Sequence, residues 1–156
     1  MKSHIYLIIV SMVLLSCKRV DQKKIPEGRT LPLEGTWKLI SGSLIEKRDT
    51  TITDYTKDKS FIKIINGTHF AFLSHDLHHG KNADSAFGAG GGSYTLKDSL
   101  YTEHLEYCND PMWEGNDFSF IITIVNDTLT QTGIEKVANT GINRLNIEKY
   151  SRIKTN

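Results

Sequence analysis

The stretch Ser93-Tyr-Thr-Leu-Lys-Asp-Ser-Leu-Tyr-Thr-Glu-His-Leu-Glu-Tyr-Cys108 decides the predicted fold of this chain. Two runs rich in strand-forming residues, 93–97 and 100–108, flank Asp98-Ser99, which is a turn signal. Because so short a connection between two strands reverses the chain, the stretch predicts an antiparallel hairpin.

The same pattern recurs along the chain. Residues 61–65 and 68–74 flank Asn66-Gly67, which predicts a type I′ turn with positive φ at both central residues. Residues 118–125 and 128–133 flank Asn126-Asp127 in the same way. With strands at 35–44 and 144–154, the sequence predicts eight strands. Consecutive hairpins favour an all-β, eight-stranded antiparallel up-and-down barrel, which removes exposed strand edges; a two-sheet sandwich is the alternative.

Helices are hard to place in this chain. Residues 46–58 form one candidate, but their repeated Thr argues against a helix. Residues 135–139 form the other candidate and are too few for a stable helix. We therefore expect almost no helix.

Alternation along the strands assigns one face of each strand to the interior. In 100–108 that face carries Tyr101, Glu103, Leu105 and Tyr107. Buried hydroxyls and a buried carboxylate require hydrogen-bonding partners. Two interpretations stay open, because an eight-stranded barrel can be filled by side chains or can hold one small ligand. The other residues assigned to the interior are Phe70, Phe72, Tyr94, Leu96, Phe118, Phe120, Ile122 and Ile124.

The N-terminus has the pattern of an export signal. Lys2 precedes an apolar run at residues 5–15, which is shorter than the roughly 20 residues of a membrane-spanning helix. The run ends in Leu14-Leu15-Ser16-Cys17, which resembles the lipobox of bacterial lipoproteins. That resemblance implies cleavage before Cys17 and lipid on its thiol and new amino group. We therefore expect attachment to a membrane through this lipid anchor.

The division of the chain follows from this signal. We expect a lipoprotein signal peptide at 1–16, a lipid-anchored tether at 17–32 and one β-barrel domain at 33–154. Lys18, rather than Asp, follows the lipobox cysteine, which in lipoproteins favours the outer membrane. The expected location is therefore the cell envelope, at the outer membrane of a Gram-negative bacterium.

Charge and cysteine content limit the function further. Loss of Lys2 reduces the 19 Lys and Arg to 18, which equals the 18 Asp and Glu, so no nucleic-acid partner is predicted. With Cys17 lipidated, Cys108 has no disulfide partner. It is then a buried small hydrophobic residue or a free thiol.

Gly35-Thr36-Trp37 at the start of the first strand matches the Gly-x-Trp opening of lipocalins. Segments 68–72, 90–96, 101–107 and 150–154 resemble, in the same order, a group of exported bacterial lipocalin-like domains of unknown function. The resemblance spans residues 33–154 and implies an eight-stranded calycin barrel with no assigned chemistry. It also implies that the guanidinium of Arg152 stacks on Trp37 and closes one end of the barrel.

Two motifs carry possible chemistry. The glycine-rich run at 88–92 lacks the Lys-Ser/Thr and the helix of a phosphate loop, so we interpret it as a bulge or a close backbone approach. His75-Asp76-Leu77-His78-His79 offers zinc-ligand side chains, but its spacing matches no standard site and a solvated loop is preferred. Since the chain also lacks a Gly-x-Ser-x-Gly or His-Glu-x-x-His motif, we predict no catalytic residue, metal or cofactor.

Two functions from different classes remain. The first is binding of a small hydrophobic or amphipathic molecule inside the barrel, with Glu103 and Arg152 orienting its polar group. The second is a structural or interaction protein with a filled barrel that binds a partner through loops 76–89 and 109–117. Met112 and Trp113 would anchor that partner, so exposure of Trp113 favours the second function and its burial weakens it. The predicted ligand-binding residues are Trp37, Phe70, Phe72, Tyr94, Tyr101, Glu103, Tyr107, Phe120 and Arg152.

Overall fold

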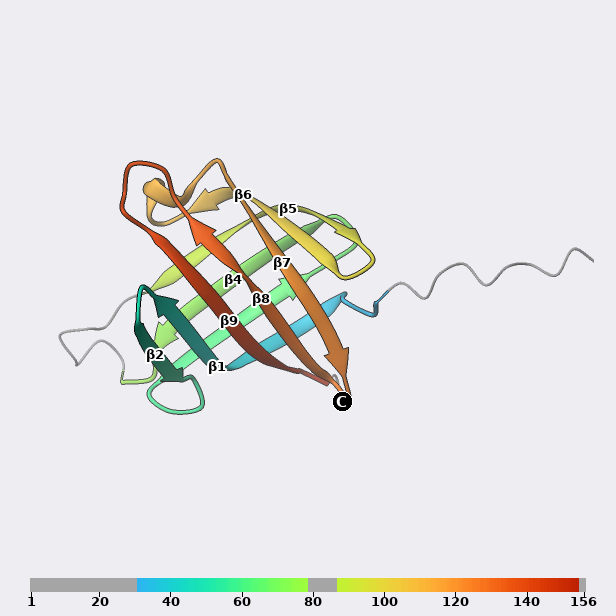
Figure 1. Ribbon diagram of the computed structural model, residues 1–156. Helices are drawn as coiled ribbons and strands as arrows, with labels where there is room; N and C mark the ends of the chain where they lie inside the picture. The colour runs from blue at the N-terminus through green and yellow to red at the C-terminus, as the bar shows by residue number, and fades with distance from the viewer. Residues whose placement is uncertain (1–30, 79–86, 155–156) are drawn as a thin grey trace, which may run out of the picture.

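The computed structural model describes residues 31–78 and 87–154, which form a closed eight-stranded antiparallel β-barrel (Figure 1). One 3₁₀ turn, η1 (Pro111–Trp113), is the only helical element in these two ranges. The strands are β1 (Gly35–Glu46), β2 (Asp49–Asp54), β3 (Lys59–Ile65), β4 (His69–Asp76), β5 (Gly88–Lys97), β6 (Leu100–Cys108), β7 (Asn116–Val125), β8 (Thr128–Lys136) and β9 (Asn143–Arg152).

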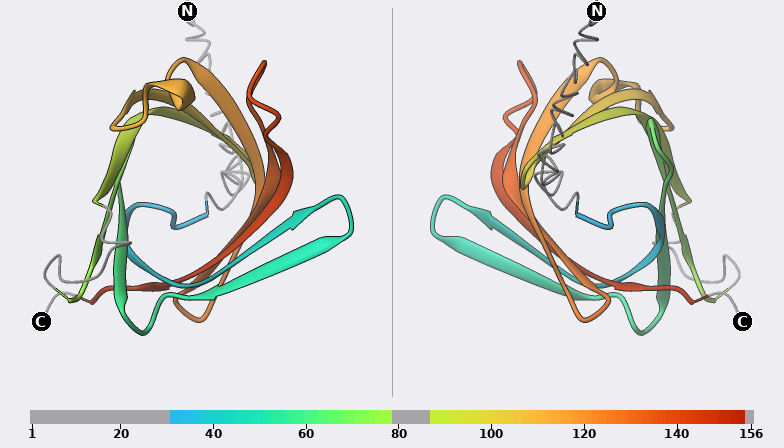
Figure 2. Two further views of the ribbon diagram at one scale, coloured as in Figure 1. Left: turned by 90° about the vertical axis from the view of Figure 1, so that its left-hand side faces the viewer. Right: turned by 90° about the vertical axis from the view of Figure 1, so that its right-hand side faces the viewer.

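The barrel closes through β1. Strands β3 to β9 pair with their neighbours in chain order, and β1 pairs with β3 on one side and with β9 on the other. Figure 2 shows the resulting ring in the views along the barrel. The predicted all-β barrel with up-and-down order is therefore confirmed, and the sandwich alternative is wrong.

Strand β2 is a ninth strand that the sequence analysis did not predict. It pairs with residues 41–46 of β1, and this hairpin projects from the ring in Figure 2. The expectation that residues 46–58 form no helix is therefore confirmed. Its β-branched residues Thr50, Thr51 and Thr53 favour the extended conformation, and Lys47 with φ of 57° forms the turn.

Two hairpin turns reverse the chain by different means. Asn126 and Asp127 both have positive φ, 48° and 59°, as a type I′ turn requires. Neither Asn66 nor Gly67 has a positive φ, so the type I′ turn predicted there is wrong. Instead, the side-chain oxygen of Asn66 accepts hydrogen bonds from the backbone N–H groups of Thr68 (2.9 Å) and His69 (2.8 Å). The hairpin is present, but a side chain closes it.

A bulge in β6 reverses the orientation of one predicted interior residue. Gly92 pairs with Leu105 and Gly91 pairs with Tyr107, so Glu106 is an extra residue in β6. A Cβ at Gly92 would lie 1.9 Å from the carbonyl oxygen of His104, which explains the glycine and confirms the expected close backbone approach. Because the extra residue shifts the alternation, Tyr107 points outward and is 67% exposed. Its predicted interior position is wrong.

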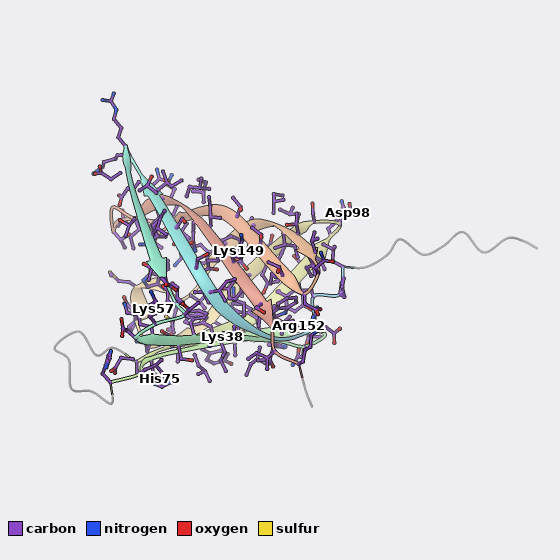
Figure 3. All side chains as sticks on the ribbon, turned by 90° about the horizontal axis from the view of Figure 1, so that it is seen from below. Lys38, Lys57, His75, Asp98, Lys149 and Arg152 are labelled. Carbon is purple, nitrogen blue, oxygen red and sulfur yellow. The ribbon has the colours of Figure 1, made fainter. Side chains whose placement is uncertain are left out.

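One end of the barrel is closed by the pair that the lipocalin resemblance implied. Trp37 is fully buried, and the guanidinium carbon of Arg152 lies 4.0 Å from the centroid of its ring. Arg152 also donates hydrogen bonds to the carbonyl oxygens of Glu34 (2.7 Å) and Pro32. The indole N–H of Trp37 donates to the carbonyl oxygen of Leu33 (2.8 Å). The segment before β1 is therefore fixed across this closed end, where Figure 3 places Arg152.

The N-terminal predictions fall largely outside the described residues. The signal peptide at 1–16, the lipidation site Cys17 and the tether up to residue 30 all lie there. Within residues 31–78 and 87–154, no helix has the length and apolar character needed to cross a membrane.

Replacement of Arg152 by alanine tests the closed end. Arg152→Ala removes a cation–π contact and two charge-assisted hydrogen bonds, so we expect a loss of about 2 kcal/mol in the free energy of unfolding, measured with urea. Lys149→Ala, on the exposed face of the same strand, serves as the control and should leave stability unchanged. Equal stability of the two variants would contradict the closing role of Arg152.

Candidate functional site

A cavity of about 310 Å³ occupies the barrel interior at the end opposite Arg152. The exposed residues Asn109 and Asp110 form part of its rim. Figure 3 locates this end by Lys57 and His75, away from Arg152 and Asp98. The described residues thus enclose a barrel that is closed at one end and hollow at the other.

Aromatic rings form one wall of the cavity. The rings of Phe61 and Phe72 are stacked, with centroids 5.7 Å apart and planes 10° from parallel. Gly90 lies beside Phe72 in the sheet, and a Cβ there would lie 2.5 Å from the ring, so the glycine leaves space for it. Trp113 of η1 packs on Phe118 at 5.7 Å between centroids. The aromatic side chains lining the cavity are Phe61, Phe72, Trp113, Phe118 and Phe120.

The floor of the cavity is a buried ion pair. Lys63 points inward from β3 and is 3% exposed. Its ammonium Nζ donates to the carboxylate of Glu103 at 2.7 Å and to the side-chain oxygen of Gln131 at 3.2 Å. The carboxylate of Glu148 lies farther away, with Oε2 at 4.0 Å from Nζ. Lys63 therefore connects strands β3, β6 and β8 across the barrel interior.

Two buried tyrosines lie next to this pair. The Tyr150 hydroxyl donates to Glu148 Oε2 at 2.7 Å, and the Lys63 ammonium lies 5.4 Å from the centroid of the Tyr150 ring. The Tyr101 hydroxyl is also buried, and its neighbour among the described residues is the Glu103 carboxylate, with no hydrogen bond of ordinary geometry between them. The two hydroxyls therefore contribute differently to stability.

Burial and neighbouring charges set the protonation of the floor. Burial lowers the pKa of the Lys63 ammonium, but the Glu103 and Glu148 carboxylates more than offset this and hold that pKa above its usual value. Burial raises the pKa of the Glu103 carboxyl, and Lys63 opposes that rise. Because Lys63 stays protonated, its amine is an electrostatic and hydrogen-bonding group and has no free lone pair for nucleophilic chemistry.

A second ion pair lines the open end. The guanidinium Nε of Arg144 donates to Glu135 Oε2 at 2.7 Å, while Asn146 donates to Glu135 Oε1 at 2.7 Å. The guanidinium also lies 5.3 Å from the centroid of the Trp113 ring. These contacts place a neutralised charge pair against the aromatic wall.

The structure separates the predicted ligand-binding residues into three groups. Phe72, Glu103 and Phe120 line the cavity. Tyr107 lies on the outer surface. Its neighbour Cys108, which was not among the predicted residues, is partly buried and lines the cavity. The predicted residues that do not line this cavity are Trp37, Phe70, Tyr94, Tyr101 and Arg152.

Three polar residues that form the floor with Glu103 were not predicted from the sequence: Lys63, Gln131 and Glu148. An inward-facing Glu103 requires a cation or a hydrogen-bond donor, and this requirement could have directed the search to an inward-facing lysine. Lys63 shares a strand face with Phe61 and Ile65, which are residues that a barrel core attracts. Which cation reaches Glu103 depends on pairing across the barrel, and local sequence does not contain that information.

The histidine-rich loop gives no metal centre within the described ranges. No group of three or more metal-ligating side chains occurs there. His78 instead contacts the carboxylate of Asp58 at 2.9 Å on the surface, and His79 lies outside the described residues.

No family model and no curated protein match this chain. Among solved structures, an uncharacterized protein from Bacteroides eggerthii DSM 20697 is similar in fold, with a TM-score of 0.44. The two chains are 10% identical, over 77% of this chain and 98% of that chain. The function is therefore inferred from the geometry of the site alone.

The buried ion pair is tested by removing its members one at a time and together. Lys63→Met leaves Glu103 buried beside Glu148 without a cation, so we expect a loss of about 3–5 kcal/mol in unfolding free energy. Lys63→Met with Glu103→Gln should be more stable than Lys63→Met alone, because the uncompensated charge at Glu103 is gone. Lys57→Met, at an exposed ion pair, is the control and should unfold like the parent. A Lys63→Met variant as stable as the Lys57→Met variant would refute the role of the pair.

Phenylalanine variants distinguish the two tyrosines. Tyr150→Phe removes a hydrogen bond to Glu148 and should cost about 1–2 kcal/mol in urea unfolding at pH 7. Tyr101→Phe removes a hydroxyl that lies beside Glu103 without a hydrogen bond of ordinary geometry, so it should cost less than Tyr150→Phe. A larger loss for Tyr101→Phe than for Tyr150→Phe would contradict these environments.

Proposed function

We propose that this protein binds a small, partly apolar molecule inside its barrel. The observation that supports the proposal most is the cavity of about 310 Å³, which combines an aromatic wall with a polar floor. Ligand sites in proteins have this composition, because apolar surface supplies affinity while a few fixed polar groups supply orientation. A volume of this size suits a molecule of roughly drug-fragment dimensions.

The lipocalin-like assignment of the barrel belongs to this proposal. It is supported by the Gly35-x-Trp37 opening and by the stacking of Arg152 on Trp37, which are the features that the resemblance implied. It also agrees with a barrel in which one end is sealed and the other holds the cavity. In this proposal the protein is a binding protein and has no catalytic residue.

The proposed location is the cell envelope, with the protein attached to the outer membrane through lipid on Cys17. Support comes from the sequence Leu14-Leu15-Ser16-Cys17 and from the course of the chain before β1. Because Pro32 and Leu33 are fixed at the closed end, the anchor connects to that end and the cavity opens at the other. A tethered barrel could therefore take up ligand from the aqueous compartment.

The second candidate function, partner binding through the loops, has weaker support. Its proposed anchor Trp113 is partly buried against Phe118 and Arg144 and forms part of the cavity wall. Met112 is 55% exposed, and Leu77 and Phe87 of the other loop are exposed as well, so these three apolar side chains remain for such a surface. The other loop of this candidate function, residues 76–89, lies partly outside the described residues.

A pair of neighbouring tryptophan variants tests ligand binding in the barrel. Cys108 lines the cavity and Tyr107 points outward, so Cys108→Trp fills the cavity whereas Tyr107→Trp is its matched control. The probe is N-phenyl-1-naphthylamine, a neutral apolar dye that fluoresces in apolar sites. We expect the parent and Tyr107→Trp to bind the dye and Cys108→Trp to bind at least about tenfold more weakly, a difference of about 1.4 kcal/mol.

Native mass spectrometry of the protein purified from its own host complements the dye experiment. We expect a retained small molecule on the parent and on Tyr107→Trp, and none on Cys108→Trp. If the parent binds neither the dye nor a host molecule, or if both tryptophan variants bind equally, the cavity is not a ligand site.

A further inference from the structure

The charges that line the cavity are unbalanced. Acidic side chains outnumber basic ones by four to two among the lining residues. This excess lies in an interior where charges interact more strongly than they do in water. The acidic residues are Glu103, Glu135, Glu148 and Asp110, and the basic residues are Lys63 and Arg144.

The ion pairs leave two lining carboxylates without a close cation among the described residues, Asp110 at the exposed rim and Glu148 on β9. Glu103 is paired with Lys63 at 2.7 Å, and Glu135 is paired with Arg144 at 2.7 Å. Within residues 31–78 and 87–154, the closest cation to Glu148 is Lys63, whose Nζ lies 4.0 Å away, beyond hydrogen-bond distance. The Glu148 carboxylate accepts one hydrogen bond within the described structure, which the Tyr150 hydroxyl donates to Oε2. Glu148, which lines the cavity, therefore has a second oxygen, Oε1, without a donor from the described residues.

The aromatic wall has the same electrostatic preference. The face of an aromatic ring carries partial negative charge and attracts cations, by about 0.5–2 kcal/mol for a well-placed ammonium. On the wall itself the structure shows this preference once, with Arg144 5.3 Å from the Trp113 ring centroid. Lys63 also lies 5.8 Å from the ring centroid of Phe70, which is outside the lining. The stacked rings of Phe61 and Phe72 line the same cavity.

We propose that the ligand is a small organic cation, an alkyl or aryl amine whose protonated nitrogen binds Glu148. The inference rests on the proposed ligand-binding function and narrows it to one chemical class. The ammonium donates to Glu148 Oε1, and the hydrocarbon part lies against Phe61 and Phe72. A carboxylate ligand of the same shape would be repelled by Glu148, whose charge the Lys63 ammonium at 4.0 Å offsets only in part. Glu103 does not orient the ligand in this arrangement, because Lys63 already occupies it.

The electrostatic part of the proposal can be measured without knowing the ligand. The chain has two cysteines, so the full chain carrying Cys17→Ser has Cys108 as its sole thiol. The reagents are the cationic 2-aminoethyl and the anionic 2-sulfonatoethyl methanethiosulfonates, which differ in charge. In the control, Leu100→Cys with Cys108→Ser moves the thiol to an exposed position on the outer surface of the same strand.

We expect the ratio of cation to anion reaction rates at Cys108 to exceed that of the Leu100→Cys control by at least about fivefold at low salt. The ratio of cation to anion reaction rates at Cys108 should decrease in Glu148→Gln. It should be unchanged in Glu46→Gln, because that carboxylate lies outside the cavity. A ratio at Cys108 equal to that of the control would overturn the proposal. If Glu148→Gln fails to fold, the rate ratio at Cys108 is still compared with the rate ratio at the Leu100→Cys thiol, and this comparison alone tests the proposal.

Ligand class is tested with hexylamine, hexanol and hexanoate, which displace N-phenyl-1-naphthylamine from the parent protein at pH 7. We expect hexylamine to compete at least about tenfold better than hexanoate, with hexanol between them. In Glu148→Gln the preference for the amine should be lost, while Glu46→Gln should keep it. If the dye binds and hexanoate competes as well as hexylamine, the amine class is wrong and ligand binding stands. If the dye does not bind the parent, ligand binding itself fails.

Discussion

The buried ammonium of Lys63 is the constraint on which the interior of this barrel depends. A cation that is 3% exposed must be matched by carboxylate and hydrogen-bond acceptors, because the desolvation of an unpaired ion costs several kcal/mol. Glu103 of β6 and Gln131 of β8 supply this match from strands that lie far from β3 in the chain. The pairing therefore fixes how the two sides of the barrel face each other. It also places polar groups where a fully packed barrel would have aliphatic side chains.

This polar layer divides the barrel into two ends with different roles. Toward the N-terminus of β1, Trp37 and Arg152 seal the interior, and the chain before β1 is held across the opening by hydrogen bonds to Leu33 and Pro32. Beyond the layer, no side chain of the described residues fills the space between the aromatic wall on β3, β4 and β7 and the polar residues on β8 and β9. Closure at one end thus supplies stability, and the other end is free to hold a molecule.

The sequence predicts the barrel well because strand periodicity is a local property. The alternation in 118–125 placed Phe118, Phe120 and Ile122 inside, and all three are buried. The errors arise where tertiary contacts override local pattern. Tyr107 points outward because a bulge opposite Gly91 and Gly92 inserts one residue, and that bulge depends on close contact between two strands. Lys63 and Glu148 escaped notice for a related reason, since only closure of the sheet brings β3 and β9 to the same cavity.

Stability alone does not account for the interior of the open end. A buried ion pair is generally no more stabilising than apolar residues of the same volume, and unfilled space loses the dispersion contacts that close packing provides. Both features reduce stability relative to a filled aliphatic core, and they occur together in one region. The nearby closed end, with Trp37 and Leu39 almost completely buried, shows that this fold can pack tightly. The polar floor and the open volume therefore support the proposed ligand site over imperfect packing as their cause.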